Sequence, residues 1–451
     1  MAKNTFADAA ARDDFSIRQE RALLVGVILD GRQIVDDPVA ELAELVRSAG
    51  ALVVGRAIQK RRAYCAASCV GAGKLEEIRQ KCDAYDADVV IFDNDLSPSQ
   101  IREIEKVTLR KVLDRSELIL DIFASRARTA EAKLQVELAQ LEYTAPRLRG
   151  MWTHLERIAG AGGATGVGAV GGIGTRGPGE KQIEIDRRLV DRRVSLLKDK
   201  IREISARRVR EVSARKKFFT VSLVGYTNAG KSTLMNALTG AETPTRDRLF
   251  ETLDTLTRRW EMGGGRFVLL SDTVGFIRDL PHHLVASFRA TLEEAIHADL
   301  LLHVADASSP ELDAQVAAVN EVLTALGAAD RPTLLLLNKI DRLDEHDAAL
   351  IRERHPDALP ISAATRAGLD HLLDAVDGLV RGQQRLRRLS IPMAAGKALV
   401  FLDRFAEVLE QRYEDGRMIV DVHISPRVLD QLHAACADIR HVDEREDADH
   451  G

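Results

Sequence analysis

The sequence is poor in the features that mark membrane, secreted and zinc-containing proteins. It contains no uninterrupted apolar stretch of about 18 residues, so no helix is expected to span a bilayer. Its first residues carry acids and no apolar core, which disfavours a secretory signal or a transit peptide. The four cysteines lack the paired spacing of a zinc site, and the chain is too large to need a disulfide framework. We therefore expect reduced, structural thiols in a cytoplasmic protein without stable membrane insertion.

What the chain does contain is material for several globular domains. Its 451 residues suggest three domains at ~150 residues each, and 45% hydrophobic residues are enough for packed cores. The net charge of −5 hides an asymmetry, because residues 181–217 hold 14 Lys and Arg against 6 Asp and Glu, a local excess of +8. Such a run is usually a solvated helix face, but a basic helix on an acidic protein also suits a partner rich in phosphate.

The first unit, residues 21–124, alternates strand-like and helix-like segments, which predicts a small parallel α/β domain after a disordered segment 1–20. Its glycine-containing stretch VGAGK (70–74) lacks the complete phosphate-loop spacing, since Leu75 stands where a hydroxyl is needed. A glycine-rich helix start is the expected structure there. The strand-like runs are RALLVGVIL (21–29), ALVVGRAI (51–58) and ADVVIFD (87–93).

Residues 125–217 are predicted to form a helical hairpin. The stretch 125–142 has apolar residues at helical spacing and no Gly or Pro, so a long exposed helix is expected, and a second helix should run from about 180 to 215. The joining segment 159–179 has ten glycines in 21 residues. It is either a flexible linker or a loop that becomes ordered on a partner. Arg176 and Lys181 at its end fit a phosphate-rich partner.

The third unit, residues 218–385, carries a phosphate-binding loop. The strand-like FFTVSLVG leads into GYTNAGKS (225–232) and the helix-like TLMNALTG, which is the G-x-x-x-x-G-K-[ST] pattern in its strand and helix context. Gly225 and Gly230 allow backbone N–H groups to turn towards phosphates. Lys231 should reach the β- and γ-phosphate oxygens, and Ser232 should bind Mg²⁺. The expected fold class is α/β, with a Ras-like P-loop domain between other α/β units.

A second strand-and-loop stretch, LLLLNKID (334–341), predicts selectivity for guanine. Asp341 can accept from N1–H and from the 2-amino group of guanine together, which adenine does not offer. Asn338 and Lys339 should hold the loop and the ring. The stretch ISAAT (361–365) should offer a backbone N–H near Ala363 to the guanine oxygen. The expected ligands are GTP and GDP.

Two further stretches should respond to the γ-phosphate. In LFETLDT (249–255), Thr252 is the candidate to bind Mg²⁺ when the γ-phosphate is present, although it can be an ordinary loop hydroxyl and Thr255 is its nearest rival. In DTVGFIRDLP (272–281), Asp272 should hold Mg²⁺ through water and Gly275 should donate its N–H to the γ-phosphate. Phe276 stands where Ras-like proteins place a glutamine that orients the attacking water. Backbone groups, a partner, or the side chain of His282 or His283 must then position this water.

The candidate site residues follow from these stretches. Candidates for catalysis are Lys231, Gly275 and Thr252, and candidates for metal binding are Ser232 and Thr252. The candidate nucleotide-binding residues are Gly225, Tyr226, Thr227, Asn228, Ala229, Gly230, Lys231, Ser232, Phe250, Glu251, Thr252, Leu253, Asp254, Asp272, Thr273, Val274, Gly275, Asn338, Lys339, Ile340, Asp341, Ser362, Ala363 and Ala364.

The phosphate-loop pattern does not determine the role of Asn228, which has two possible functions. Several GTPases that lack the glutamine place an Asn here to bind K⁺ beside the phosphates, where a cation offsets transition-state charge. The alternative is that Asn228 caps the turn or tolerates a left-handed backbone. Besides Mg²⁺, K⁺ is therefore a candidate cofactor.

Taken together, the chain resembles the HflX GTPases of the TRAFAC class, which lack the catalytic glutamine. The resemblance covers roughly residues 21–425 and is carried by DNDLSPSQ, VLDRSELILDIFASRARTAEAKLQVELAQLEY, GGIGTRGPGEKQIEIDRR, GYTNAGKSTL, FETLDT, DTVGFIRDLPHHLV and NKID. It implies a nucleotide-binding-like N-terminal domain and a hairpin whose glycine-rich tip approaches ribosomal RNA through residues 159–215. It also implies a monomeric GTPase that acts on the large ribosomal subunit and splits or rescues ribosomes under stress.

The resemblance also assigns residues 386–440 to a small C-terminal α/β docking domain. There MIVDVHIS reads as a strand and GKALVFLDRFAEVLEQR as an amphipathic helix, and the acidic tail 441–451 should be disordered. Departures from the family pattern are Glu251, Met235 and the pair Cys65 and Cys69. Other functions compatible with the nucleotide motifs are a signalling switch that acts on a protein effector, which leaves the basic helix unexplained, and a metabolic P-loop kinase, against which Asp341 argues.

Overall fold

The structure is a computed structural model whose contacts divide the chain into two units, Met1–Ile122 with Thr144–Thr175 and Phe123–Tyr143 with Arg176–Gly451. None of the described helices is long and apolar enough to cross a membrane. Several predicted features lie outside the described part of the chain. These are the hairpin tip, Thr252, and all but a few residues of the two ends that were predicted to be disordered. The structure describes residues 19–30, 37–145, 188–204, 218–241, 250, 256–263, 266–278, 295–382, 384–414, 416–436 and 438–442.

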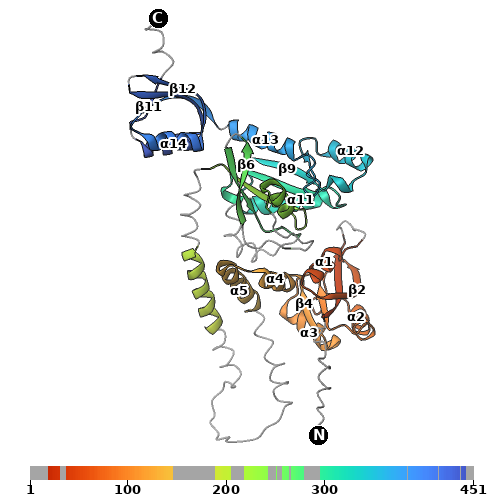
Figure 1. Cartoon of the computed structure of the whole chain (residues 1–451). Helices are drawn as coiled ribbons and strands as arrows, with labels where there is room; N and C mark the ends of the chain where they lie inside the picture. The colour runs from red at the N-terminus through yellow and green to blue at the C-terminus, as the bar shows by residue number, and fades with distance from the viewer. Residues whose placement is uncertain are drawn as a thin grey trace, which may run out of the picture. The chain divides into compact units, whose positions relative to one another are not determined.

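The first unit is built on a four-stranded parallel sheet, which confirms the α/β expectation (Figure 1). Its strands are β1 (Arg21–Leu29), β2 (Leu52–Arg61), β3 (Val89–Phe92) and β4 (Lys111–Asp114), in the order β2-β1-β3-β4. The central strands β1 and β3 are buried, and their apolar runs are typical of strands covered on both faces. The helices are α1 (Ala40–Ser48), α2 (Ala72–Ala84), α3 (Pro98–Thr108) and α4 (Arg115–Arg126).

Local sequence explains where two of these helices begin. Before α3, the hydroxyl of Ser97 accepts a hydrogen bond from the backbone of Gln100, whose side chain bonds back to the Ser97 N–H, and Pro98 occupies the first helical turn. Helix α2 begins directly after Gly71, so the expected glycine-rich helix start is confirmed. Both helices contribute apolar side chains, including Ile78 and Ile104, to one core cluster against the sheet.

The helix expected from residue 125 differs from the observed one. Helix α4 ends at Arg126, and α5 (Ala130–Thr144) begins after a break. The hydroxyl of Thr129 accepts a hydrogen bond from the Ala132 N–H at 3.1 Å, so it caps a new helix. The prediction of an exposed helix was also wrong, because α5 buries several side chains, among them Gln135 and Val136. Residues 188–204 are helical and meet α5 through two ion pairs, Arg193 with Glu137 and Lys198 with Glu142.

The GTPase-like region of the second unit has a six-stranded sheet in the order β10-β9-β8-β5-β7-β6. Only β6 runs antiparallel to its neighbour, β7. The strands are β5 (Thr220–Gly225), β6 (Leu256–Gly263), β7 (Arg266–Asp272), β8 (Leu300–Asp306), β9 (Thr333–Asn338) and β10 (Leu359–Pro360). The helices around it are α8 (Lys231–Thr239), α11 (Leu312–Ala325), η1 (Ile340–Arg342), α12 (Glu345–Arg354) and α13 (Leu369–Gly382).

The carboxyl ends of β5, β7 and β9 each lead directly into a sequence motif. Strand β5 leads into the phosphate loop, β7 into DTVGF, and β9 into NKID. Because the carboxyl ends of parallel strands meet at one edge of a sheet, the fold gathers these three motifs there.

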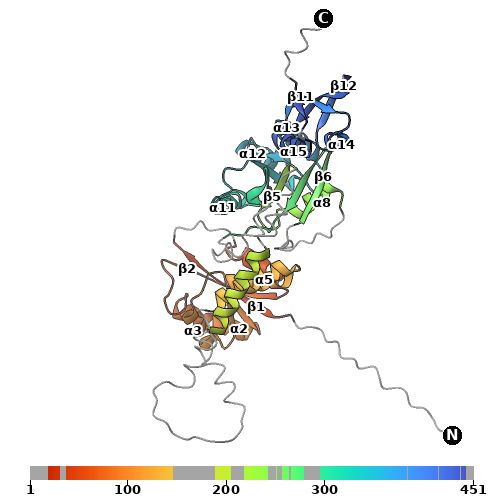
Figure 2. The ribbon, with the colours of Figure 1, turned by 90° about the vertical axis from the view of Figure 1, so that its left-hand side faces the viewer.

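The C-terminal region is a four-stranded antiparallel sheet in the order β12-β13-β11-β14. Two helices pack side by side on one of its faces (Figure 2). Their side chains Leu402 and Leu432 are buried in one cluster with Val420 and Val422 of the sheet. The elements are β11 (Arg385–Pro392), α14 (Gly396–Phe405), β12 (Glu407–Glu414), β13 (Arg417–Ile424), α15 (Pro426–Ala435) and β14 (Arg440–His441).

The amphipathic helix expected over residues 396–412 is wrong in its second half. Helix α14 ends at Phe405, and residues Glu407–Glu414 form strand β12, which pairs along the whole of β13. Although Glu, Leu, Gln and Arg favour helices, the ladder hydrogen bonds of an otherwise open sheet edge outweigh this weak preference. The strand expected over MIVDVHIS is present as β13.

Candidate functional site

The phosphate loop between β5 and α8 needs both of its glycines. Gly225 has φ +150°, and a Cβ there would lie 2.1 Å from the carbonyl oxygen of Val304. Gly230 has φ +95°, and its Cβ would lie 2.2 Å from Nδ2 of Asn338. Real Cβ atoms do not approach other heavy atoms so closely, and a side chain rarely adopts these φ values. The loop therefore curves tightly against β8 on one side and the NKID loop on the other.

Lys231 folds back over this loop. Its Nζ donates to the carbonyl oxygens of Gly225 at 3.0 Å and Tyr226 at 2.7 Å. Burial lowers the pKa of Lys231 to about 8, while the negative charge of Asp272 acts in the opposite direction. A bound phosphate would stabilise the ammonium and raise this pKa again. The lysine is thus already held at the place where its charge can meet phosphate oxygens.

Oxygen ligands suitable for a magnesium ion lie beside the lysine. The hydroxyl of Ser232, in the first turn of α8, donates to Oδ2 of Asp272, at the end of β7, at 2.7 Å. Magnesium prefers a few protein oxygens and keeps several waters and phosphate oxygens. A hydroxyl and a carboxylate in contact, next to the phosphate loop, fit this requirement.

The DTVGF loop pairs with the phosphate loop through its backbone. The Phe276 N–H donates to the Gly225 oxygen at 3.1 Å, and the Thr227 N–H donates to the Phe276 oxygen at 2.7 Å. The Phe276 side chain is only 2% exposed, so it packs in the interior. A Cβ at Gly275 would lie 2.7 Å from Cγ2 of Thr227 and 3.1 Å from Nζ of Lys231. The close approach of these loops therefore requires glycine at position 275.

Asn338 joins the phosphate loop to the loop at residues 361–365. Its Nδ2 donates to the Ala229 oxygen at 2.7 Å, and its Oδ1 accepts from the Ala363 N–H at 2.9 Å. These bonds connect residues that lie 109 and 25 positions away in the sequence. The side chain is almost fully buried, so both bonds are protected from water.

Asp341 and Lys339 are each held by one polar partner. The Ser362 hydroxyl donates to Oδ1 of Asp341 at 2.5 Å, which orients the carboxylate. Lys339 has a left-handed backbone, with φ +65°, and its Nζ lies 2.8 Å from Oδ2 of Asp306. The pairing of Asp306 with Lys339 was not predicted from the sequence. The position of Asp306 at the end of β8, between the two motif-bearing strands β5 and β9, could have indicated this role.

The structure describes some of the remaining predicted site residues and leaves others out. Residues 251–255 lie outside the described part of the chain, so Glu251, Thr252, Leu253 and Asp254 have no observed geometry. Phe250 is described and packs edge-on against Phe123, with ring centroids 4.6 Å apart, which is a packing contact. The other described members, Thr273, Val274, Ile340 and Ala364, lie on the DTVGF, NKID and 361–365 loops.

A buried histidine below the phosphate loop was missed by sequence analysis. His303 lies on β8, where it pairs with Val224 of β5. Burial lowers the pKa of His303 to about 4, and the positive charge of Lys231 adds to this effect. The imidazole is therefore neutral at physiological pH.

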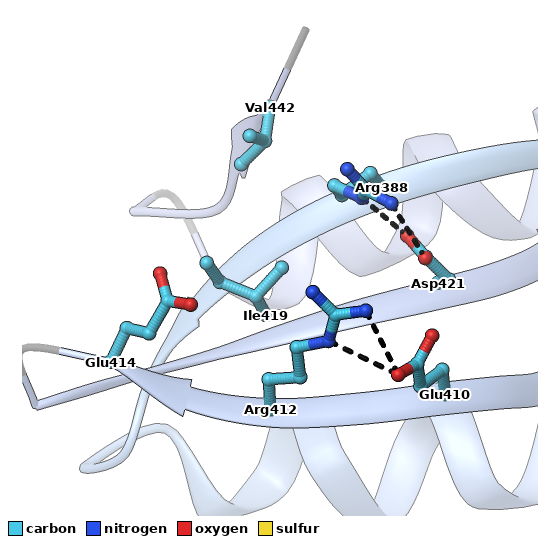
Figure 3. Close-up of a pocket in the computed structure, with 7 residues that line it drawn as sticks. All are labelled: Arg388, Glu410, Arg412, Glu414, Ile419, Asp421 and Val442. Atoms are coloured by element: carbon cyan, nitrogen blue, oxygen red, sulfur yellow. Dashed lines mark hydrogen bonds and ion pairs between the residues drawn. The ribbon is translucent and has the colours of Figure 1, made fainter. Parts of the chain in front are cut away.

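The open face of the C-terminal sheet carries a shallow charged pocket (Figure 3). Arg388 contacts Asp421 at 2.8 and 3.0 Å, and Arg412 contacts Glu410 at 3.1 Å. The Arg388 guanidinium lowers the pKa of the Asp421 carboxyl. Because Arg388 and Arg412 are each paired with an acid and Glu414 adds a further negative charge to the lining, the pocket offers no excess positive charge for phosphate.

Three family models match consecutive parts of the chain. A model described as GTP-binding GTPase N-terminal matches residues 36–124, and one described as GTP-binding GTPase Middle Region matches residues 126–215. A third, described as 50S ribosome-binding GTPase, matches residues 220–339. The last range contains the phosphate loop, the DTVGF loop and the start of NKID.

Similar proteins extend over nearly the whole chain. The GTPase HflX of Lacrimispora saccharolytica is 41% identical over 418 residues, which cover 92% of this chain and 96% of the relative. The GTPase HflX of Escherichia coli is 42% identical over 413 residues, covering 90% and 93%. A GTP-binding protein of Sulfolobus solfataricus, solved in complex with GDP, is 26% identical, with a TM-score of 0.41 and coverage of 80% of this chain and 98% of that chain.

Proposed function

The chain belongs to the HflX family of GTPases and is a GTP-hydrolysing enzyme, and from this premise we propose that it binds the large ribosomal subunit and splits or rescues ribosomes under stress. The description of the model that matches residues 220–339 supports the ribosomal partner. The splitting or rescue step rests on the family resemblance. We also propose that the protein acts as a monomer.

The nucleotide part of this proposal is carried by the double hydrogen bond of Asn338. It links the phosphate loop at Ala229 with the expected guanine loop at Ala363, at 2.7 and 2.9 Å. Binding of the phosphates at the phosphate loop would therefore also hold the guanine-binding loop in place, through Asn338. Asp341, oriented by Ser362, would recognise the N1–H and 2-amino groups of guanine.

Each residue around the phosphates would then have a defined part in hydrolysis. Ser232 and Asp272 would hold Mg²⁺, directly and through water, with Thr252 joining when GTP is bound. The ion would neutralise charge on the phosphate oxygens. Lys231 would exchange its bonds to loop carbonyls for bonds to phosphate, and the Gly275 N–H would donate to the γ-phosphate.

The attacking water needs a different source of orientation from that in Ras-like proteins. A buried Phe276 side chain cannot hold water, which supports slow intrinsic hydrolysis and water placed by backbone groups or by the ribosomal subunit. His282 and His283, the alternative side chains, lie outside the described residues. We infer that the subunit accelerates hydrolysis by ordering the switch loops.

Asn228 supports a potassium-dependent variant of this mechanism. It is exposed at the rim of the phosphate loop with φ +60°, a backbone that equally suits an ordinary turn residue. If it binds K⁺, subunit-stimulated hydrolysis should be faster in K⁺ than in Na⁺ at matched ionic strength, and Asn228→Ala should remove the difference. Equal rates of the wild type in the two salts, with subunit binding intact, would exclude the cation.

We further propose that residues 159–215 make the ribosomal contact. In the described part, 188–204, Arg193 and Lys198 are paired with acids of α5, while Arg192 is exposed on the same helix. Replacing Arg187, Arg188, Arg192 and Arg193 by Ser should weaken binding and flatten its salt dependence, because fewer counterions are released. Arg193→Ser and Lys198→Ser alone are controls, since each of these two charges already has an acidic partner and should contribute less to binding than the full set of four.

Co-sedimentation with purified large subunits tests the proposal directly. The chain should sediment with the subunits in the presence of a non-hydrolysable GTP analogue and much less with GDP. No co-sedimentation in either state, with GTP binding intact, would contradict the proposal and favour a switch that acts on a protein effector. Release of small subunits from intact ribosomes by the GTP-bound chain then tests the splitting step.

A further inference from the structure

The loop between β2 and α2 brings two cysteines face to face. The Cys65 N–H donates to the Cys69 oxygen at 2.9 Å, and the Cys69 N–H donates to the Cys65 oxygen at 2.9 Å. Residues that exchange both hydrogen bonds have Cα atoms about 5.5 Å apart. That separation lies within the window of roughly 4.4–6.8 Å in which a disulfide can form. The backbone pairing thus places the two Cα atoms within that window.

The two thiols of this pair have unlike surroundings. Cys65 is partly exposed, and hydrogen bonds from the backbone of Ala67 and Ser68 stabilise its thiolate and lower its pKa. Cys69 is 2% exposed and belongs to the core cluster of the sheet. Burial raises the pKa of Cys69 to about 11, and the nearby Cys65 charge raises it further. One sulfur is therefore reachable and nucleophilic, and the other is a protected thiol beside it.

Further contacts hold the loop in this arrangement. The side chain of Gln100, at the start of α3, donates from Nε2 to the Cys65 oxygen at 3.0 Å. The Ser68 hydroxyl donates to the Val70 oxygen at 2.9 Å. Cys69 itself has φ +62°, a left-handed backbone that is uncommon for a residue with a side chain. The pairing is therefore fixed by the fold and not by chance proximity of two flexible side chains.

From this geometry we propose that Cys65 and Cys69 form a peroxide-reactive pair, in which Cys65 is oxidised first and Cys69 closes an intramolecular disulfide. The Cys65 thiolate attacks one peroxide oxygen, the O–O bond breaks, and an alkoxide or hydroxide leaves and takes up a proton. Cys65 is then a sulfenic acid. The Cys69 sulfur attacks it, the S–O bond breaks, and the Cys69 proton leaves with the oxygen as water. Two thiols are oxidised to one disulfide, and one peroxide is reduced.

The other two cysteines provide internal controls. Cys82 is fully buried in α2, where burial raises its pKa to about 11, so its thiol should be inert. Cys436 follows α15 in the C-terminal region and is partly exposed like Cys65. Exposure alone therefore predicts equal oxidation of Cys65 and Cys436, whereas the paired geometry predicts oxidation at Cys65.

The full, pre-reduced chain should be treated with one equivalent of hydrogen peroxide, alkylated and digested with trypsin. Both cysteines of the pair fall in one tryptic peptide, residues 63–74. This peptide should lose two hydrogen atoms and take no alkyl group, and thiol reductants should reverse the change. Peptides with Cys82 and Cys436 should stay alkylated and be oxidised more slowly than the 63–74 peptide, in which the paired geometry lets a sulfenic acid close to a disulfide.

Single substitutions separate the two parts of the reaction. Cys69→Ser should leave a sulfenic acid at Cys65 that dimedone traps, and Cys65→Ser should leave Cys69 a thiol. Cys82→Ser should behave as the wild type, and a wild-type circular-dichroism spectrum and urea transition of the full chain report that each variant is folded. Equal oxidation of Cys65 and Cys436, a disulfide between chains, or an unchanged 63–74 peptide would each overturn the proposal.

Discussion

The turn between β2 and α2 and the turn between β5 and α8 both carry a parallel strand into a helix through glycines and a lysine. In the first, Gly71 has an ordinary φ of −71°, and a Cβ at Gly73 would meet nothing within 4 Å. In the second, both glycines have positive φ and would collide with Val304 and Asn338. The phosphate-loop spacing therefore encodes a tightly curved backbone, whereas a glycine and a lysine alone encode a helix start.

The two lysines differ in the same way. Lys74 contacts Glu77 at 2.9 Å, three residues further along its own helix, which is a common helical ion pair. Lys231 is buried and bonds only to carbonyl oxygens of its loop among the contacts described. The first lysine stabilises a helix slightly, and the second holds a charge where phosphate would bind.

The largest predicted contrast is between Gly230→Ala and Gly73→Ala. In Gly230→Ala, a strained backbone costs about 1–3 kcal/mol, and each buried bond lost by a displaced Asn338 costs about 1–3 kcal/mol more. GTP should therefore bind about 1,000-fold more weakly, at 1.4 kcal/mol for each factor of ten. Titration calorimetry with GTP measures this change.

Gly73→Ala is the matched control for that experiment. It has room for a Cβ and lies in a helix, so it should leave GTP affinity unchanged and stabilise α2 by about 0.5–1 kcal/mol. Comparable losses of GTP affinity in both variants would contradict the conclusion that only the β5–α8 turn needs its glycine for nucleotide binding.

A smaller contrast is expected between Lys231→Ala and Lys74→Ala. Removing a charge preorganised for the phosphates should lower kcat/KM for GTP by about 10²-fold, the scale for a single electrostatic donor. Lys74→Ala should leave the rate within error, because the loss is confined to a helical ion pair. Steady-state phosphate release measures both, and full activity in Lys231→Ala would remove this lysine from the proposed mechanism.

The smallest predicted effect concerns the histidine under the second turn. His303 has its pKa lowered from 6.5 to about 4, so its stabilising effect is present above the unfolded value of 6.5 and is lost as pH falls towards 4. Between pH 7 and pH 5 this residue should remove about 2 kcal/mol from the free energy of unfolding, at 1.36 kcal/mol per unit. Urea unfolding followed at Trp260 of the same sheet should report it. His303→Asn should flatten the pH dependence, and an unchanged slope in that variant would refute the assignment.

The motifs could be predicted from the sequence because each is local and places unusual residue types at fixed spacing, as from Gly225 to Ser232. The contacts between motifs could not be predicted in this way, since the bonds of Asn338 depend on how β5, β9 and the 361–365 loop come together. The strand β12 was missed for a related reason: its sequence favours a helix, and only the neighbouring β13 makes a strand more stable.

The nucleotide specificity of Asp341→Asn reports directly on how the site selects its nucleotide. In the proposed mechanism, the site formed by the β5–α8 turn and the NKID loop hydrolyses GTP, and Asp341 recognises its guanine base. Asn replaces one of the two carboxylate oxygens of Asp by an NH2 donor, which cannot pair with the 2-amino group of guanine but can donate to the 2-oxo group of xanthine. The variant should lose hydrolysis of GTP and gain hydrolysis of xanthosine triphosphate in the same assay. Unchanged GTP hydrolysis with no activity towards xanthosine triphosphate would contradict this mechanism.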